Sequence, residues 1–88
     1  MKVAAAKREL ANEAKRLGLV GVTVEDDSGG DEVRIQVCAP DGKMWAEGPK
    51  HLVCSTYRGP QSWLDDVVKD TKERMSYGLR DAEDGEED

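Results

Sequence analysis

Residues 33–38 have the sequence Val-Arg-Ile-Gln-Val-Cys, and this stretch decides the fold. Apolar residues stand at every second position, which is the period of a β-strand with one buried and one solvated face. Val20, Val22 and Val24 show the same alternation. The loop at 26–31, Asp-Asp-Ser-Gly-Gly-Asp, separates the two segments. The sequence therefore predicts two antiparallel strands joined by a polar connector.

A turn follows at residues 40–42, Pro-Asp-Gly. Proline presets the first central φ angle, aspartate bonds its own backbone and glycine accepts a left-handed conformation. The sequence predicts a hairpin into a third strand at 43–47. A two-residue turn would leave Trp45 on the solvated face, whereas a three-residue turn with a bulge would direct Trp45 inward. Both registers remain open at this stage.

Residues 51–57 form another strand-like run, His-Leu-Val-Cys-Ser-Thr-Tyr. Pro49 cannot donate to a central ladder, so an interruption is expected just before this run. The run either continues the third strand after a break or forms a fourth short strand.

Two amphipathic helices flank the strands. Over residues 2–17 the apolar positions recur at intervals of three and four, and Gly18 provides a stop. A second helix is predicted from a cap at Ser62 to a stop at Gly78, with Leu79 making the closing hydrophobic contact. Its expected apolar stripe is Leu64, Val67, Val68, Thr71 and Met75.

The predicted fold is a single α+β domain of order α-β-β-β-α, with three or possibly four antiparallel strands. Each helix has one apolar stripe and each strand one apolar face, so both helices are expected on the same face of the sheet. The domain is expected to span residues 1–79, and Trp63 is expected to pack locally at the start of the second helix.

Residues 80–88 are expected to form a disordered acidic tail. The chain carries 13 basic and 19 acidic residues, for a formal net charge of -6. Six of the acidic residues and none of the basic ones lie in residues 81–88, so the body of the chain is neutral. A block of like charges repels itself and stays solvated.

The composition excludes several protein classes. No apolar run approaches the roughly 18 residues of a membrane span, and the N-terminus lacks the apolar segment of a signal peptide. We therefore expect a cytoplasmic protein with no membrane contact. Cys38 and Cys54 are then expected to be reduced thiols, although a disulfide between neighbouring strands is geometrically possible.

Catalytic and metal chemistry find little support in the sequence. His51 and Cys54 are three residues apart, so in a strand their side chains point to opposite faces. One histidine and two cysteines fall short of the usual four zinc ligands. The acidic loop at 26–32 lacks the ligand spacing of an EF-hand. We expect no catalytic residue, no metal and no cofactor, and hence a non-enzyme.

The element order resembles that of the double-stranded-RNA-binding domain, and residues 47–51, Glu-Gly-Pro-Lys-His, resemble the Gly-Pro-x-His loop of that family. The resemblance covers five residues. Asp65 and Asp66 stand where the family has basic residues that grip phosphate, so RNA binding does not carry over to this chain.

The favoured function from sequence is a non-catalytic module that binds an unknown protein partner, as a monomer or weak homodimer. In style, a small domain with an acidic tail resembles accessory and inhibitor proteins of phages and prophages. With a two-residue turn, an exposed tryptophan would lie among polar side chains that suit an interface. The candidate partner-binding residues are Trp45, Arg34, Gln36, Lys43 and Glu47.

The alternative function is association with nucleic acid through the first helix. This helix carries a basic strip that could contact phosphate, and the acidic tail would then compete for it. The candidate residues are Lys7, Arg8, Lys15 and Arg16. A solvated helix face is the simpler interpretation of such charges.

Overall fold

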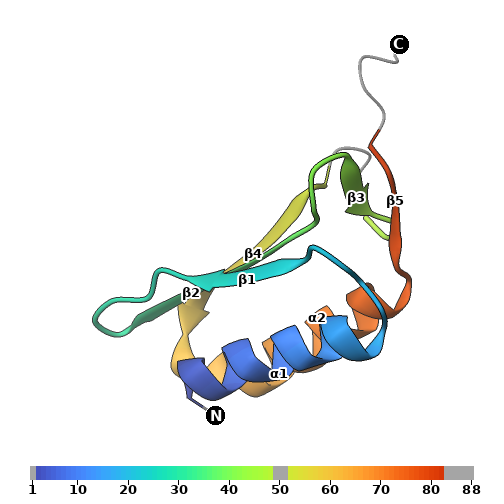
Figure 1. Cartoon of the computed structure of the whole chain (residues 1–88). Coiled ribbons are helices and arrows are strands. Elements are labelled where there is room, and N and C mark those ends of the chain that lie inside the picture. Colours follow the sequence, from blue (N-terminus) through green and yellow to red (C-terminus); the bar gives the residue numbers. More distant parts are fainter. Residues whose placement is uncertain (1, 49–51, 83–88) are drawn as a thin grey trace.

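Two helices lie on one side of an antiparallel sheet in the computed structural model, which describes residues 2–48 and 52–82 (Figure 1). This arrangement confirms the predicted α+β class. The elements in chain order are α1 (Val3–Arg16), β1 (Thr23–Asp26), β2 (Glu32–Cys38), β3 (Lys43–Trp45), β4 (Cys54–Pro60), the 3-10 turn η1 (Gln61–Trp63), α2 (Leu64–Ser76) and β5 (Leu79–Asp81).

The main sheet has the strand order β1-β2-β4, and both pairings are antiparallel. The alternation in β2 works as the sequence predicts, because Val33, Ile35 and Val37 are buried and face the helices. Ile35 lies opposite Asp26 on β1 and Tyr57 on β4. The central strand thus supplies the main apolar surface, and β1 and β4 form the two edges.

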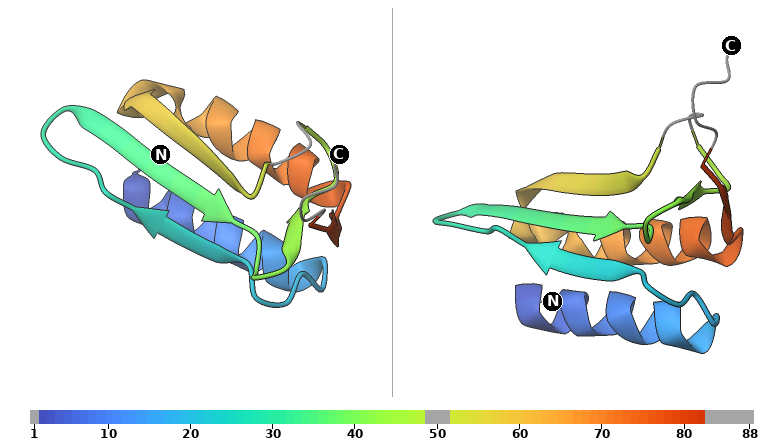
Figure 2. Two further views of the ribbon diagram at one scale, coloured as in Figure 1. Left: turned by 90° about the horizontal axis from the view of Figure 1, so that it is seen from above. Right: turned by 45° about the horizontal axis from the view of Figure 1, so that its top comes forward.

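The helices cover the apolar face of this sheet side by side (Figure 2). In α1 the buried residues are Ala6, Leu10 and Ala14, and in α2 they are Leu64, Val68 and Met75. An ion pair between Lys72 and Glu9, 3.0 Å long, also connects the helices. The opposite face of the sheet carries no helix in the described part of the chain.

The predicted hairpin between residues 33–38 and 43–47 is wrong. The turn forms, with the amide of Lys43 donating to the carbonyl of Pro40 over 3.0 Å, but it leads the chain away from the main sheet. β3 pairs instead with β5 in a separate two-stranded sheet, and β4 takes the place beside β2. β5 follows α2 and has three residues, too few to show a period.

Trp45 belongs to the core, so of the two orientations that the sequence left open the inward one is correct. The side chain is 1% exposed, and the indole Nε1–H donates to the carbonyl of Val37 over 3.4 Å. Trp63, expected to pack locally, is 57% exposed. The inward orientation of Trp45 follows from the β3–β5 pairing, which turns β3 over the end of the main sheet.

The first strand begins later than the alternation of valines suggests. Gly18 and Gly21 have φ angles of 75° and 90°, which keep the intervening chain in a turn. Val20 is therefore 87% exposed, and β1 starts at Thr23. Gly18 does end α1 as predicted, since the helix stops at Arg16.

The start of α2 and the start of the tail also differ from expectation. Ser62 makes no side-chain cap; it lies in η1, and α2 begins at Leu64. Arg80 and Asp81 form part of β5, so the predicted tail starts too early. The remaining acidic residues, 83–88, lie outside the described part of the chain, as do residues 49–51 of the Gly-Pro-x-His resemblance.

The two cysteines form a disulfide, which overturns the expectation of reduced thiols. Cys38 ends β2, Cys54 begins β4, and the two residues are cross-strand partners with Cα atoms 4.0 Å apart. The expectation rested on the inferred compartment rather than on the fold. Once β4 lies beside β2, the pairing register brings the two side chains together.

Candidate functional site

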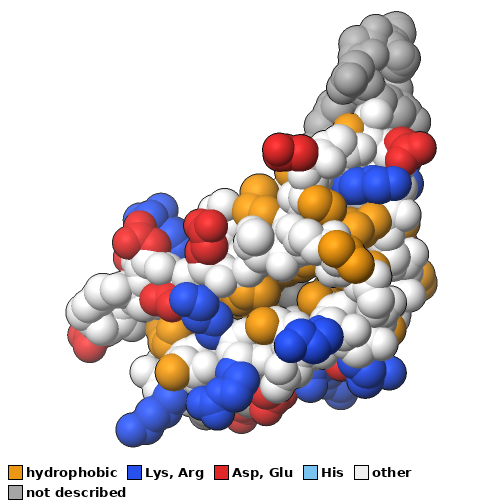
Figure 3. Space-filling view, in the orientation of Figure 1, with side chains coloured by type: hydrophobic (Ala, Val, Ile, Leu, Met, Phe, Trp, Pro, Cys, Tyr) orange, Lys and Arg blue, Asp and Glu red, His pale blue; other side chains and the backbone are white. Residues whose placement is uncertain are grey.

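A cavity of about 670 Å³ lies between α1 and the edge strand β1. In the space-filling view it appears as a hollow between the helix and the sheet, with hydrophobic side chains inside (Figure 3). Small and apolar residues form most of its lining, and basic residues of α1 stand at its rim. The lining residues are Val3, Ala4, Lys7, Arg8, Ala11, Val24, Asp26 and Ser28.

A second cavity, of about 360 Å³, continues the first toward the C-terminal end of α1. Ala11 lines both cavities, so they lie end to end along the helix. The second cavity is lined by Ala11, Ala14, Lys15, Gly18, Leu19, Val20, Gly21 and Val22. We refer to the two cavities together as the α1–β1 groove.

The β1 side of the groove is the open edge of the main sheet. The amide of Asp27 donates to the carbonyl of Arg34 over 2.9 Å, which sets the alternation of hydrogen bonds between β1 and β2. In an antiparallel ladder the intervening residues turn their N–H and C=O groups away from the partner strand. Val24 and Asp26 therefore present their main-chain groups to the open edge.

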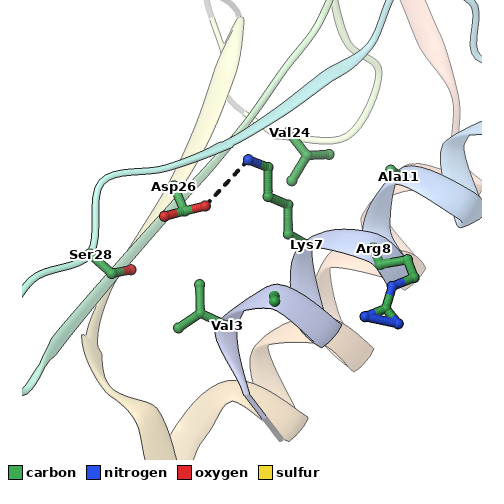
Figure 4. Close-up of a pocket in the computed structure, with 8 residues that line it drawn as sticks. Val3, Lys7, Arg8, Ala11, Val24, Asp26 and Ser28 are labelled. Carbon is green, nitrogen blue, oxygen red and sulfur yellow. Dashed lines mark ion pairs between the residues drawn. The ribbon is translucent and has the colours of Figure 1, made fainter.

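An ion pair crosses the groove. Lys7 reaches from α1 toward Asp26, with its Nζ atom 3.3 Å from the carboxylate, between Val3 and Val24 (Figure 4). The two side chains are 45% and 32% exposed. An exposed pair of this kind contributes little free energy, about 0–1 kcal/mol. The ion pair is therefore readily opened.

Other cations of the groove have no carboxylate partner. Within residues 2–48 and 52–82, neither Arg8 nor Lys15 forms an ion pair. Arg8 lies beside the first cavity and Lys15 beside the second. The groove thus combines an apolar floor, two residues of an unpaired strand edge and two uncompensated positive charges.

The five residues predicted to bind a partner do not form one surface. Arg34 and Gln36 lie on the open face of the sheet, where Arg34 pairs with Asp27 over 2.9 Å. Lys43 pairs with Asp81 across the second sheet, and Glu47 lines a separate small cavity beside α2. Because Trp45 is buried, the proposed anchor of the surface is absent. A partner contact at the four polar residues stays a prediction.

The four basic residues of the alternative function divide into two groups. Lys7, Arg8 and Lys15 line the α1–β1 groove. Arg16 instead donates from both Nε and Nη2 to Glu13, with the shorter bond 2.6 Å long. These hydrogen bonds lower the pKa of Glu13 and raise that of Arg16. The structure therefore places three of the four along one groove, where Lys7 reaches toward β1 and Arg8 points away from it (Figure 4).

The described structure gives no support to catalysis by Cys54 with His51, or to a metal site. Cys54 is bonded to Cys38, and His51 lies outside the described residues. No group of three His, Cys, Asp or Glu side chains in the described part of the chain is arranged to hold a metal ion. Among the same residues, no helix has both the length and the apolar character needed to cross a membrane.

Sequence reasoning missed the groove because the groove depends on how α1 packs beside β1 and the turn before it. The available signal was the spacing of Ala4 and Ala11, which are seven residues apart and so share one helix face with Lys15. These small residues leave room between α1 and the sheet. Comparisons of the chain with protein-family models, curated proteins and solved structures find no match.

Proposed function

We propose that this protein is a non-catalytic interaction module that binds an extended, acidic segment of a partner protein in the α1–β1 groove. The observation that carries the proposal is the coincidence of an open strand edge with an apolar floor and two unpaired cations. Each of these features recognises a different property of the same ligand.

The strand edge recognises an extended main chain. Val24 and Asp26 offer N–H and C=O groups at the spacing of alternate strand residues. A partner segment that adds to this edge forms main-chain hydrogen bonds, and its alternate side chains enter the pockets beside it. The edge is four residues long, so the bound segment is short.

The floor and the rim select the side chains of that segment. Small and medium apolar residues such as Val3, Val22 and Val24 can bury alternate apolar side chains of the ligand. Arg8 and Lys15 favour carboxylates at the flanking positions, and Arg8 can form a bidentate pair with one of them. The expected ligand is therefore a segment in which apolar and acidic residues alternate.

The Lys7–Asp26 ion pair lies in the path of the ligand. Because the pair is exposed, its rupture costs little, and Lys7 becomes available to a carboxylate of the incoming segment. Binding thus exchanges one intramolecular ion pair for an intermolecular one. We expect the affinity to weaken as the salt concentration rises.

The test is a selection of linear peptides on the full chain, followed by NMR titration with the enriched sequence. We expect an alternating apolar and acidic motif, and movement of the amide signals of Val24 and Asp26. Ala11→Glu places a negative charge where the two cavities meet and should weaken binding at least about tenfold. Thr56→Glu makes the same charge change at an exposed position of β4, away from the groove, and should leave affinity unchanged.

Three results would overturn the proposal. The selection could yield no enriched peptide, Thr56→Glu could weaken binding as much as Ala11→Glu, or the signal changes could map to the open face of the sheet. A duplex or single-stranded oligonucleotide that binds at low salt while no peptide does would assign the groove to phosphate instead.

A further inference from the structure

Two contacts through the 40–42 turn connect the end of the described chain to one end of the α1–β1 groove. The amide of Ala82 donates to the carbonyl of Gly42 over 2.9 Å, so the chain leaves β5 beside the 40–42 turn. Pro40 of this turn packs against Gly21, where an added Cβ would lie 2.7 Å from the Cβ of Pro40. Gly21 lines the second cavity together with Lys15.

Six residues, 83–88, follow Ala82 in the sequence. An extended segment of this length spans roughly 20 Å. Lys15 belongs to the nearer cavity, and Arg8 lies about 10 Å further along the helix axis at 1.5 Å per residue. Lys15 is therefore the groove cation on which such a segment would first dock.

The charges of the two parts are complementary. Residues 83–88, Glu-Asp-Gly-Glu-Glu-Asp, contain five acidic residues and no basic or apolar one. Arg8 and Lys15 are the groove cations that lack an ion pair in the described structure. Covalent attachment supplies the segment at an effective concentration in the millimolar range, which makes weak ionic contacts significant.

We propose that residues 83–88 dock on Lys15 of the same chain, the nearer groove cation, and act as a built-in competitor for the groove. The competition rests on the proposed function, whereas the docking itself does not. The segment has no apolar side chain for the floor of the groove, so it occupies the basic rim alone. A partner segment with both apolar and acidic residues displaces it, and purely acidic ligands are excluded.

Docking is tested by comparing NMR spectra of the full chain with those of a chain ending at Ala82. This truncation keeps β5 and the Ala82–Gly42 hydrogen bond, so the fold is retained. At low salt we expect differences at the amides of Lys15 and Gly21, which vanish near 1 M salt, where the Debye length is about 3 Å. The matched control keeps the tail length but changes all five acids to their amides, and should resemble the truncated chain.

Competition is tested with a groove-binding peptide from the selection described above. Removal of residues 83–88 should tighten its binding at least about fivefold at low salt, and the amide-substituted tail should do the same. The docking proposal fails if the spectra of the full and truncated chains agree at low salt, or if they differ only away from the groove. Peptide binding without any effect of the tail would reject this inference and leave the proposed function standing. Salt-dependent shifts at Lys15 without binding of any peptide would support docking and reject the proposed function.

Discussion

Cys38 and Cys54 are directly opposite residues of β2 and β4, and a disulfide joins them where the two strands meet the 39–53 segment. That segment contains β3, which pairs with β5 and not with the main sheet. The amide of Ala39 donates to the carbonyl of Val53 over 2.9 Å just beyond the bridge. The disulfide therefore joins β2 and β4 at the two points between which the segment with the buried Trp45 lies in the sequence.

Loss of the disulfide should destabilise the fold. Changing both cysteines to alanine removes a cross-link between two residues that are 16 apart in the sequence. Restored chain entropy in the unfolded state should reduce the free energy of unfolding by about 3 kcal/mol for a loop of this size. Urea unfolding with and without a dithiol reductant measures the effect. The reductant should lower the midpoint of the natural chain and leave that of the double variant unchanged; equal midpoints for the natural chain would contradict this prediction.

Trp45→Ala should be among the most destabilising substitutions. It removes a fully buried indole and leaves a cavity, which typically costs about 3–5 kcal/mol. Trp63→Ala is the matched control, because that side chain is 57% exposed and should change stability by about 0.5 kcal/mol or less. Chemical unfolding followed by circular dichroism compares the two variants. Equal losses in both would show that Trp45 is not a core residue.

Gly21→Ala should destabilise the turn that precedes β1. Gly21 has a φ angle of 90°, and a Cβ there would collide with Pro40. We expect a loss of more than about 1 kcal/mol in the free energy of unfolding. Gly29→Ala provides the comparison, because no heavy atom lies within 4 Å of its would-be Cβ. Thermal unfolding that ranks Gly29→Ala as the worse variant would refute the expectation.

Asp81 should contribute stability that acid removes. Its carboxylate accepts a hydrogen bond of 2.7 Å from Lys43, which lowers the pKa of Asp81 in the folded state. A carboxyl with a lowered folded pKa stabilises the fold above its unfolded pKa, and the contribution is lost as the pH falls through the folded pKa. Asp81→Asn should thus be less stable than the natural chain at neutral pH, and the two should converge in acid. Thermal unfolding midpoints measured over a pH series test this, with Asp41→Asn as the control. A difference in midpoint between the natural chain and Asp81→Asn that grows as the pH falls would contradict the prediction.

Periodicity was sufficient to predict the elements with a strong apolar pattern. Val33, Ile35 and Val37 fix β2, and the stripes ending at Ala14 and Met75 fix the two helices. These residues also fix the α+β class and the placement of both helices on one face. Local patterns of this kind depend only on neighbours along the chain, so the sequence reveals them directly.

The strand partners and the candidate site could not be predicted in the same way. The hairpin from β2 to β3 is favoured locally by Pro40 and Gly42, but the pairing of β3 with Leu79–Asp81 prevails through burial of Trp45. A three-residue strand has no period to recognise. The disulfide follows from the resulting strand order, so the wrong pairing concealed it.

The pairing of β3 with β5 also determines when the molecule can be completed during synthesis. β3 lies near the middle of the sequence, and its partner is not present until Leu79–Asp81 leaves the ribosome. Until then Met44 and Trp45 lack the strand beside which they are buried in the finished fold. While residues 46–81 are made, the nascent chain therefore exposes Met44 and Trp45 to chaperones and to other nascent chains. The second sheet can form only after the last described strand has been made.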